Sequence, residues 1–161
     1  ASDGRDVLLW TRRSELAEEL AELFDPACDE AEQTFRSQIA KHLMVLGDRD
    51  LIGQALSNLL DNAIKYTPAG GTINFTVVRG PEGTVDLTVL DTGPGVPADA
   101  RKRVVQRFQR MDSARTQPGS GLGLALVVSV AEMHGGELIL SEGNGPAESP
   151  GLKATLRLPR A

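Results

Sequence analysis

Polar side chains recur along one flank of a helix that the sequence predicts from about Asp48 to Tyr66. At about 100° per residue, Asn58, Asn62 and Lys65 fall, with Tyr66, in one sector of about 100°. The neighbouring sector is apolar and must face the core; it holds Ile52, Leu56, Leu59, Leu60 and Ala63. Amide oxygens beside a lysine suit a hydrated Mg²⁺ ion and phosphate oxygens, since Mg²⁺ takes oxygen ligands and keeps several waters. A solvated helix flank that tolerates two Asn residues is the alternative.

A second motif, Asp91-Thr92-Gly93-Pro94-Gly95, follows a predicted strand. Its carboxylate can accept a hydrogen bond from an exocyclic amine, and its glycines let a flat ring approach the backbone. A tight turn without any ligand would have the same sequence.

A third motif, Gly119-Ser120-Gly121-Leu122-Gly123-Leu124, opens an apolar helix. The free N–H groups and the positive dipole end of a helix attract anions, and glycines leave room for phosphates. The chain contains no G-x-x-x-x-G-K-[ST] sequence, which excludes a P-loop. These glycines follow a loop and not a strand, which argues against a dinucleotide-binding motif.

Positive charge gathers just before these glycines. Six of the 17 basic residues lie close together in the chain: Arg101, Lys102, Arg103, Arg107, Arg110 and Arg115. Such a segment can neutralise a polyphosphate. The first three also fit the solvent face of an amphipathic helix, so Arg110 and Arg115, which flank a predicted loop, are the better candidates for phosphate contact.

The elements that must position these motifs follow from periodicity and turn signals. We predict helices over residues 12–24, 48–66, 98–109 and 121–134, the first of them ended by Pro26. Strands are predicted over residues 33–39, 43–46, 72–79, 84–90, 137–141 and 153–158, and a loop over 110–120. Helices and mostly hairpin-joined strands that share one core indicate a two-layer α/β sandwich.

Length and composition limit the class of protein. The 161 residues suit one domain, and 22 acidic against 17 basic residues argue against a nucleic-acid-binding surface. No apolar run approaches the roughly 20 residues of a membrane span, so we expect no membrane contact by this domain. Cys28 stands alone and forms neither an intrachain disulfide nor a cysteine zinc site. The chain starts at Ala1 without Met, which leads us to expect a piece of a larger protein.

Taken together, the motifs resemble the four boxes of sensor histidine kinases. Residues 58–68 resemble their N box, 91–95 their G1 box, 104–110 their F box and 119–124 their G2 box. The resemblance runs over residues 46–159. It implies the ATP-binding sandwich shared with gyrase: a mixed, mostly antiparallel sheet covered on one face by helices, with a flexible ATP lid at about 107–120.

The resemblance also implies a role for each matching residue. Asn62 would coordinate Mg²⁺, Asn58 would support the metal and phosphates, and Lys65 would contact phosphate. Asp91 would accept from the adenine amino group. With Arg110, the residues Asn58, Asn62 and Lys65 form the expected catalytic set. The expected nucleotide contacts are completed by Tyr66, Gly93, Gly95, Phe108, Arg115, Gly119, Gly121, Leu122, Gly123 and Leu124. Two departures from the family pattern are Val105 in place of a second Phe and Leu152-Lys153-Ala154 near the end.

The identity of Asn58 bears on the phosphoryl acceptor. Related hydrolytic ATPases and serine kinases carry a glutamate general base at that position, and Asn cannot take a proton. An imidazole is already a neutral nucleophile near pH 7, so histidine needs less help from a base. The two histidines of the chain, His42 and His134, lack the sequence around a phosphorylated histidine, and we expect both to be structural.

The resemblance therefore implies the cytoplasmic, catalytic and ATP-binding domain of a sensor histidine kinase. It would bind MgATP and transfer the γ-phosphoryl group to a histidine on a separate helical hairpin that also dimerises, and so act indirectly on a response regulator. Any membrane anchor would belong to the rest of the parent kinase. The alternative is a catalytically inactive module of the same fold that senses nucleotide or binds protein. Asn58 disfavours a third option, an ATP-hydrolysing machine.

Overall fold

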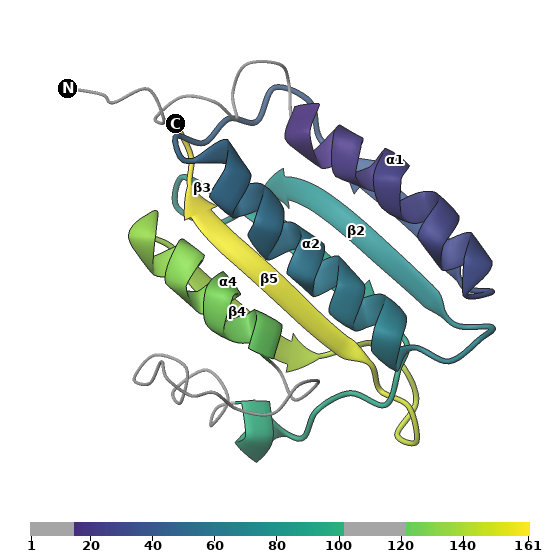
Figure 1. Ribbon diagram of the computed structural model, residues 1–161. Coiled ribbons are helices and arrows are strands. Elements are labelled where there is room, and N and C mark those ends of the chain that lie inside the picture. The colour runs from purple at the N-terminus through teal and green to yellow at the C-terminus, as the bar shows by residue number, and fades with distance from the viewer. Residues whose placement is uncertain (1–14, 102–121) are drawn as a thin grey trace.

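A single five-stranded sheet organises the chain, of which the computed structural model describes residues 15–101 and 122–161. The strands are β1 (Thr34–Ile39), β2 (Thr72–Arg79), β3 (Thr84–Asp91), β4 (Glu137–Glu142) and β5 (Leu152–Pro159). They lie in the order β1-β2-β3-β5-β4; β1 pairs parallel with β2, and the other neighbours are antiparallel. The helices α1 (Glu15–Glu30), α2 (Arg49–Tyr66) and α4 (Leu122–Met133) cover one face (Figure 1). The predicted two-layer sandwich with a mixed, mostly antiparallel sheet is confirmed.

The central helix α2 begins and faces the core as predicted. Asp48 is its N-cap, because the Asp48 carboxylate accepts hydrogen bonds from the backbone N–H groups of Asp50 (3.0 Å) and Leu51 (3.2 Å). The buried stripe that packs on the sheet consists of Ile52, Ala55, Leu56, Leu59, Leu60 and Ala63. The opposite flank is thereby left to carry polar side chains.

The first helix is longer than we predicted. Pro26 does not end α1, which continues to Glu30 with Pro26 inside it. The reason is the spacing of the core contacts: Leu20, Phe24 and Cys28 are all buried at intervals of four residues, so the apolar stripe passes beyond the proline. Pro26 itself is exposed, where its ring and its missing N–H are tolerated best.

Two other predicted elements have a different outcome. The strand predicted over residues 43–46 is wrong: Leu43 and Val45 are buried, but the segment forms no strand. An apolar run marks burial, and here the burial comes from packing under α1 and α2 without a pairing partner. Of the helix predicted over 98–109, the described residues 98–101 are helical. The rest of that helix and the loop predicted over 110–120 lie outside the described residues.

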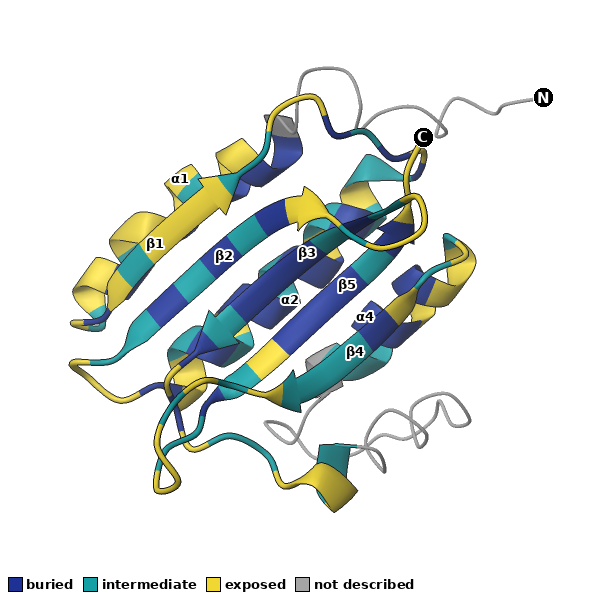
Figure 2. Cartoon of the chain, turned by 180° about the vertical axis from the view of Figure 1, so that it is seen from behind, coloured by how far each residue is buried: buried dark blue, intermediate teal, exposed yellow. Residues whose placement is uncertain are grey.

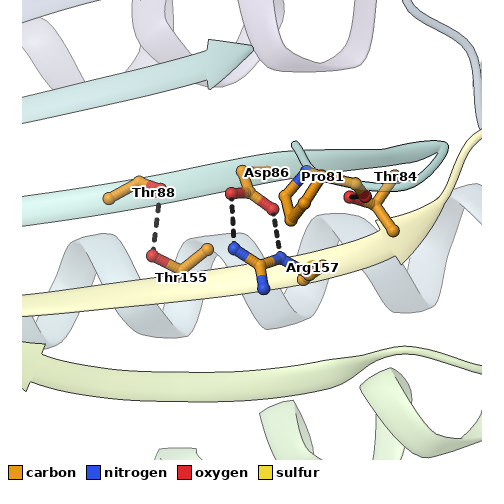
Figure 3. Close-up of polar contacts among 6 residues, drawn as sticks. All are labelled: Pro81, Thr84, Asp86, Thr88, Thr155 and Arg157. Carbon is orange, nitrogen blue, oxygen red and sulfur yellow. Dashed lines mark hydrogen bonds and ion pairs between the residues drawn. The ribbon is translucent and has the colours of Figure 1, made fainter. Parts of the chain in front are cut away.

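The face of the sheet away from the helices carries polar cross-strand pairs. Figure 2 shows this face, and Figure 3 shows two pairs between β3 and β5. Arg157 binds Asp86 with both ends of its guanidinium, Nε to Oδ1 at 2.8 Å and Nη2 to Oδ2 at 2.9 Å. The hydroxyls of Thr88 and Thr155 are hydrogen-bonded at 3.1 Å. These pairs fix the register of β3 and β5 on the face away from the helices.

Candidate nucleotide site

A pocket of about 300 Å³ opens between α2, the ends of β3 and β5, and the turn that follows β3. Its walls are mostly apolar. The lining residues are Leu59, Asn62, Ala63, Tyr66, Val89, Asp91, Pro94, Gly95, Val96, Leu124, Leu152 and Ala154. A small apolar cavity with a few convergent polar groups is the usual form of a small-molecule site. Three separate predicted motifs meet here, since Asn62 and Tyr66, Asp91 and Gly95, and Leu124 come from different parts of the chain.

Asp91 supplies the carboxylate of this pocket. It is only 7% exposed, and its Oδ1 accepts from the backbone N–H groups of Gly93 (2.9 Å) and Leu152 (3.1 Å). Burial raises the pKa of the Asp91 carboxyl, and the two N–H donors oppose that rise. Within residues 15–101 and 122–161, Oδ2 has no hydrogen-bond partner. One oxygen is thus fixed by the fold and the other is available to accept from a ligand.

The glycines around Asp91 are required by close backbone contacts. A Cβ on Gly93 would lie 2.6 Å from the carbonyl oxygen of Tyr66, so only glycine lets this turn pack on the end of α2. Gly95 has a φ of 78°, which glycine adopts without strain. Residues 91–95 therefore do form the tight turn that was the alternative to a ligand site, and this turn also borders the pocket.

A second loop, residues 143–151 between β4 and β5, holds this turn in place. Gly151 has a φ of 80°, and a Cβ there would lie 2.0 Å from the carbonyl oxygen of Asp91. Its N–H donates to Gly93 O at 2.8 Å, and the Ser149 hydroxyl donates to Thr92 O at 2.9 Å. No local pattern indicates this role, because the partners lie about 60 residues apart in the chain.

The polar flank of α2 divides between two hollows. Asn62 and Tyr66 line the pocket described above, whereas Asn58 lines a second, open hollow of about 690 Å³ over the outer side of α2. Lys65 is exposed, and its Nζ lies 5.3 Å from the centre of the Tyr66 ring. The four predicted residues therefore lie in a row along one flank of α2 and do not share one cavity.

Most residues of the predicted glycine-rich motif and of the basic segment before it lie outside the described residues. Phe108, Arg110, Arg115, Gly119 and Gly121 are among those not described, as is the lid predicted at about 107–120. Leu122 and Gly123 begin α4, so the predicted start of a helix at the glycine cluster is confirmed, and Leu124 reaches the pocket wall.

The apolar walls of the pocket were missed by the sequence analysis. Leu59 and Ala63 were placed in the core, and Val89 in a strand, without a ligand contact. Leu152 and Ala154, noted only as departures from the family pattern, line the pocket too. The alternation of apolar and polar residues in β3 and β5 could have indicated Val89, Leu152 and Ala154, because it places every second side chain on the face that is turned toward α2.

The two histidines lie in different surroundings. His42 is exposed at a turn with a φ of 64°. The Nδ1 of His134 lies 2.7 Å from the carbonyl oxygen of Val130, and its Nε2 accepts from the N–H of Asp48. In the part of the chain that the structure describes, no three His, Cys, Asp or Glu side chains could jointly hold a metal ion. None of the described helices is long and apolar enough to cross a membrane.

Comparison with known proteins places this site in a family. The model of the histidine kinase-, DNA gyrase B- and HSP90-like ATPase family matches residues 47–161. The chain belongs to this family. All pocket-lining residues of the ATPase-family domain lie within the matched segment. The resemblance to this family that the sequence motifs implied is confirmed over these residues.

The relatives are histidine kinases. The signal transduction histidine-protein kinase/phosphatase MprB of Mycolicibacterium smegmatis is 42% identical over 115 residues, 71% of this chain and 23% of the relative. MprB of Mycobacterium leprae is 40% identical over 115 residues, 71% of this chain and 22% of the relative. The ATPase-family domain thus spans between a fifth and a quarter of the length of these curated relatives.

Solved structures give the same result. The mycobacterial sensor histidine kinase MprB matches with a TM-score of 0.77 at 32% identity, covering 93% of this chain and 95% of that one. Full-length ShkA in complex with AMPPNP matches with a TM-score of 0.73 at 31% identity, covering 91% of this chain and 30% of that one. The ATPase-family domain therefore has the fold and sequence of a histidine kinase catalytic domain.

Proposed function

We propose that this domain binds MgATP and transfers its γ-phosphoryl group to a histidine on a separate helical hairpin. The observation that carries the proposal is the pocket of about 300 Å³ with apolar walls and the half-satisfied Asp91 carboxylate. Its size and walls suit a purine ring, and Asp91 Oδ2 is an acceptor for the exocyclic amine of adenine. The related ShkA structure holds AMPPNP, an ATP analogue.

The described residues also fit a magnesium ion bound through phosphate. Mg²⁺ keeps several waters and needs only one or two protein oxygens when a triphosphate supplies the rest. Asn62 borders the pocket one helical turn from Tyr66 and would give its amide oxygen. When bound, the metal would neutralise the developing phosphate charge. Asn58 and Lys65 continue the row outward and would support the phosphates, joined by Arg110, Arg115 and the backbone amides around Gly121.

The acceptor is proposed to be histidine because of the residue type at position 58. Asn58 occupies the place of the glutamate base and cannot take a proton, whereas an imidazole reacts without that help. His42 is exposed at a turn, His134 accepts from the Asp48 N–H, and neither has the sequence around a phosphorylated histidine, so the acceptor would lie on the dimerising hairpin of the parent kinase. A response regulator would receive the phosphoryl group next, and the domain would work in the cytoplasm.

Calorimetry of MgATP binding tests the first half of the proposal. The wild-type domain should bind MgATP at micromolar to millimolar concentrations, and Asn62→Ala should remove most of the gain in affinity that Mg²⁺ gives over free ATP. Asn74→Ala, at a half-buried Asn on the open sheet face, is the matched control. Absence of binding at millimolar MgATP would show that the proposal is wrong.

Phosphoryl transfer is tested by mixing the domain with the helical hairpin of its own parent kinase and labelled ATP. Acid-labile, base-stable label on the hairpin is the expected result, as is characteristic of phosphohistidine. Label on serine, or rapid ATP hydrolysis without the hairpin, would contradict the argument from Asn58. MgATP binding without any labelled hairpin would favour the alternative of an inactive nucleotide-sensing module.

A further inference from the structure

Gln33 joins the ends of two helices at one buried point. It lies just before β1, is 6% exposed, and its backbone N–H donates to Cys28 O near the end of α1 at 2.8 Å. Its side-chain Nε2 donates to Ile64 O at 2.9 Å and to Thr67 O at 2.7 Å at the end of α2. One residue therefore caps α1 with its main chain and α2 with its side chain.

The end of α2 needs such a donor because Thr67, which follows the helix, is buried and Ile64 is half-buried. The last carbonyl groups of a helix have no partner within the helix, and buried carbonyls must find one elsewhere. The N–H of Thr67 donates to Ala63 O at 3.0 Å, and the Gln33 side-chain amide donates to Ile64 O and Thr67 O. An amide offers two N–H donors from one nitrogen, which a hydrocarbon side chain of similar size cannot replace.

The same helix end forms one side of the nucleotide pocket. Tyr66 lines the pocket and lies between the two carbonyls that Gln33 holds. On its other side, the Tyr66 carbonyl packs against Gly93, whose N–H donates to Asp91 at 2.9 Å. The end of α2 is thus held between Gln33 and the turn that orients Asp91.

We propose that Gln33 is a positioning residue for nucleotide binding, acting through the end of α2 on Tyr66 and the Asp91 turn. The inference rests on the proposed nucleotide function of the pocket. It extends the site beyond the family match, because Gln33 lies outside residues 47–161. The backbone beside it supports the same junction, with Gly70 N–H donating to Glu32 O at 2.8 Å and Thr34 N–H to Gly71 O at 2.9 Å.

The test compares Gln33→Leu with Gln38→Leu, the same substitution at an exposed position of β1. Calorimetry would measure the Kd of MgATP and of adenosine at a temperature where circular dichroism shows every variant folded. Gln33→Leu should weaken both ligands by about tenfold, the scale on which a lost supporting hydrogen bond affects a site. Gln38→Leu should bind both as the wild type does. The similar loss for adenosine and MgATP follows because Gln33 acts at the nucleoside end.

Hydrogen exchange supplies a readout that does not depend on a ligand. In Gln33→Leu the amide of Thr67 should exchange faster than in the wild type, while amides in the middle of α2 should not. Unchanged Kd values in folded Gln33→Leu, or unchanged exchange at Thr67, would overturn the inference. If Gln33→Leu does not fold, the decision falls to Gln33→Asn, which keeps the amide but shortens its reach. A wild-type domain that binds neither ligand would refute the nucleotide function, and exchange at Thr67 would still test the helix junction.

Discussion

The Nε2 atom of His134 accepts a hydrogen bond from the backbone N–H of Asp48 at 3.0 Å. The ring therefore carries its proton on Nδ1, which donates to Val130 O at 2.7 Å. It lies over Gly47, where a Cβ would approach the ring to 2.5 Å. This histidine joins the end of α4 to the start of α2, as expected of a structural residue.

His134→Ala should lower the free energy of unfolding by about 1–3 kcal/mol, because the Asp48 N–H loses a partly buried acceptor and packing over Gly47 is lost. Chemical denaturation measures the change. His42→Ala is the control: its side chain is exposed, and its effect should stay within about 0.5 kcal/mol. Equal effects of the two substitutions would contradict a joining role for His134.

Asp91→Asn should weaken adenine nucleotides by about 10- to 100-fold, since a hydrogen bond to a charged group contributes about 1.5–3 kcal/mol. The melting temperature should stay the same or rise, because Asn keeps an oxygen for the Gly93 and Leu152 N–H groups and removes a buried charge. Calorimetry and thermal unfolding measure the two effects. Asp29→Asn, exposed on α1, is the control. A large loss of stability would favour a purely structural Asp91.

The same carboxyl gives a pH dependence. Its pKa is raised in the folded protein, so the folded state binds more protons than the unfolded state just above the ordinary pKa of aspartate. The contribution of Asp91 to the free energy of unfolding therefore falls as pH rises through this range. Asp91→Asn lacks this titration, so the variant should become more stable relative to the wild type as pH rises. Denaturation at several acidic pH values checks the sign, and a difference that shrinks with rising pH would contradict it.

Gly151→Ala should destabilise the domain by more than 2 kcal/mol and abolish nucleotide binding, since its Cβ would lie 2.0 Å from Asp91 O. Gly70→Ala is matched in backbone conformation, with a φ of 90°, but a Cβ there meets nothing within 4 Å. It should cost only about 1 kcal/mol and leave the Kd for MgATP unchanged. Similar costs for both variants would mean that backbone strain, and not the contact with Asp91, explains Gly151.

Cys28 should resist thiol reagents in the folded protein. It is fully buried, and burial, with a smaller effect from Asp25, raises the pKa of its thiol from 9.0 to about 11. Between these values the folded state keeps a proton that the unfolded state loses, so stability should fall by on the order of 2 kcal/mol from pH 9 to pH 11. Cys28→Ala should lack this fall, as measured by denaturation. Rapid labelling of native protein would contradict the burial.

Local sequence patterns correctly predicted those helices and strands whose formation does not depend on distant contacts. Alternation located β2 and β3, and an N-cap with an apolar stripe located α2. The errors occurred where tertiary contacts decide. Pro26 is tolerated because Cys28 packs beyond it, and Leu43 and Val45 are buried without a pairing strand.

The site divides in the same way. Asn62 and Asp91 were predicted because their residue types carry chemistry, and the fold brings both to one pocket. Gly151 and Gln33 were not, because their functions depend on carbonyl groups more than 30 residues away. A sequence pattern carries no record of such distant backbone partners.

The parallel pairing of β1 with β2 has a consequence for any shortened form of the domain. A fragment that starts at residue 47, where the family match begins, would lose β1 and leave the row of N–H and C=O groups on β2 without a partner. The intact sheet ends in β1, whose side chains are mostly exposed, whereas β2 alternates buried and half-buried side chains, and an open apolar strand of this kind tends to pair with other chains. Such a fragment would self-associate through β2, although every box of the family would still be present in it.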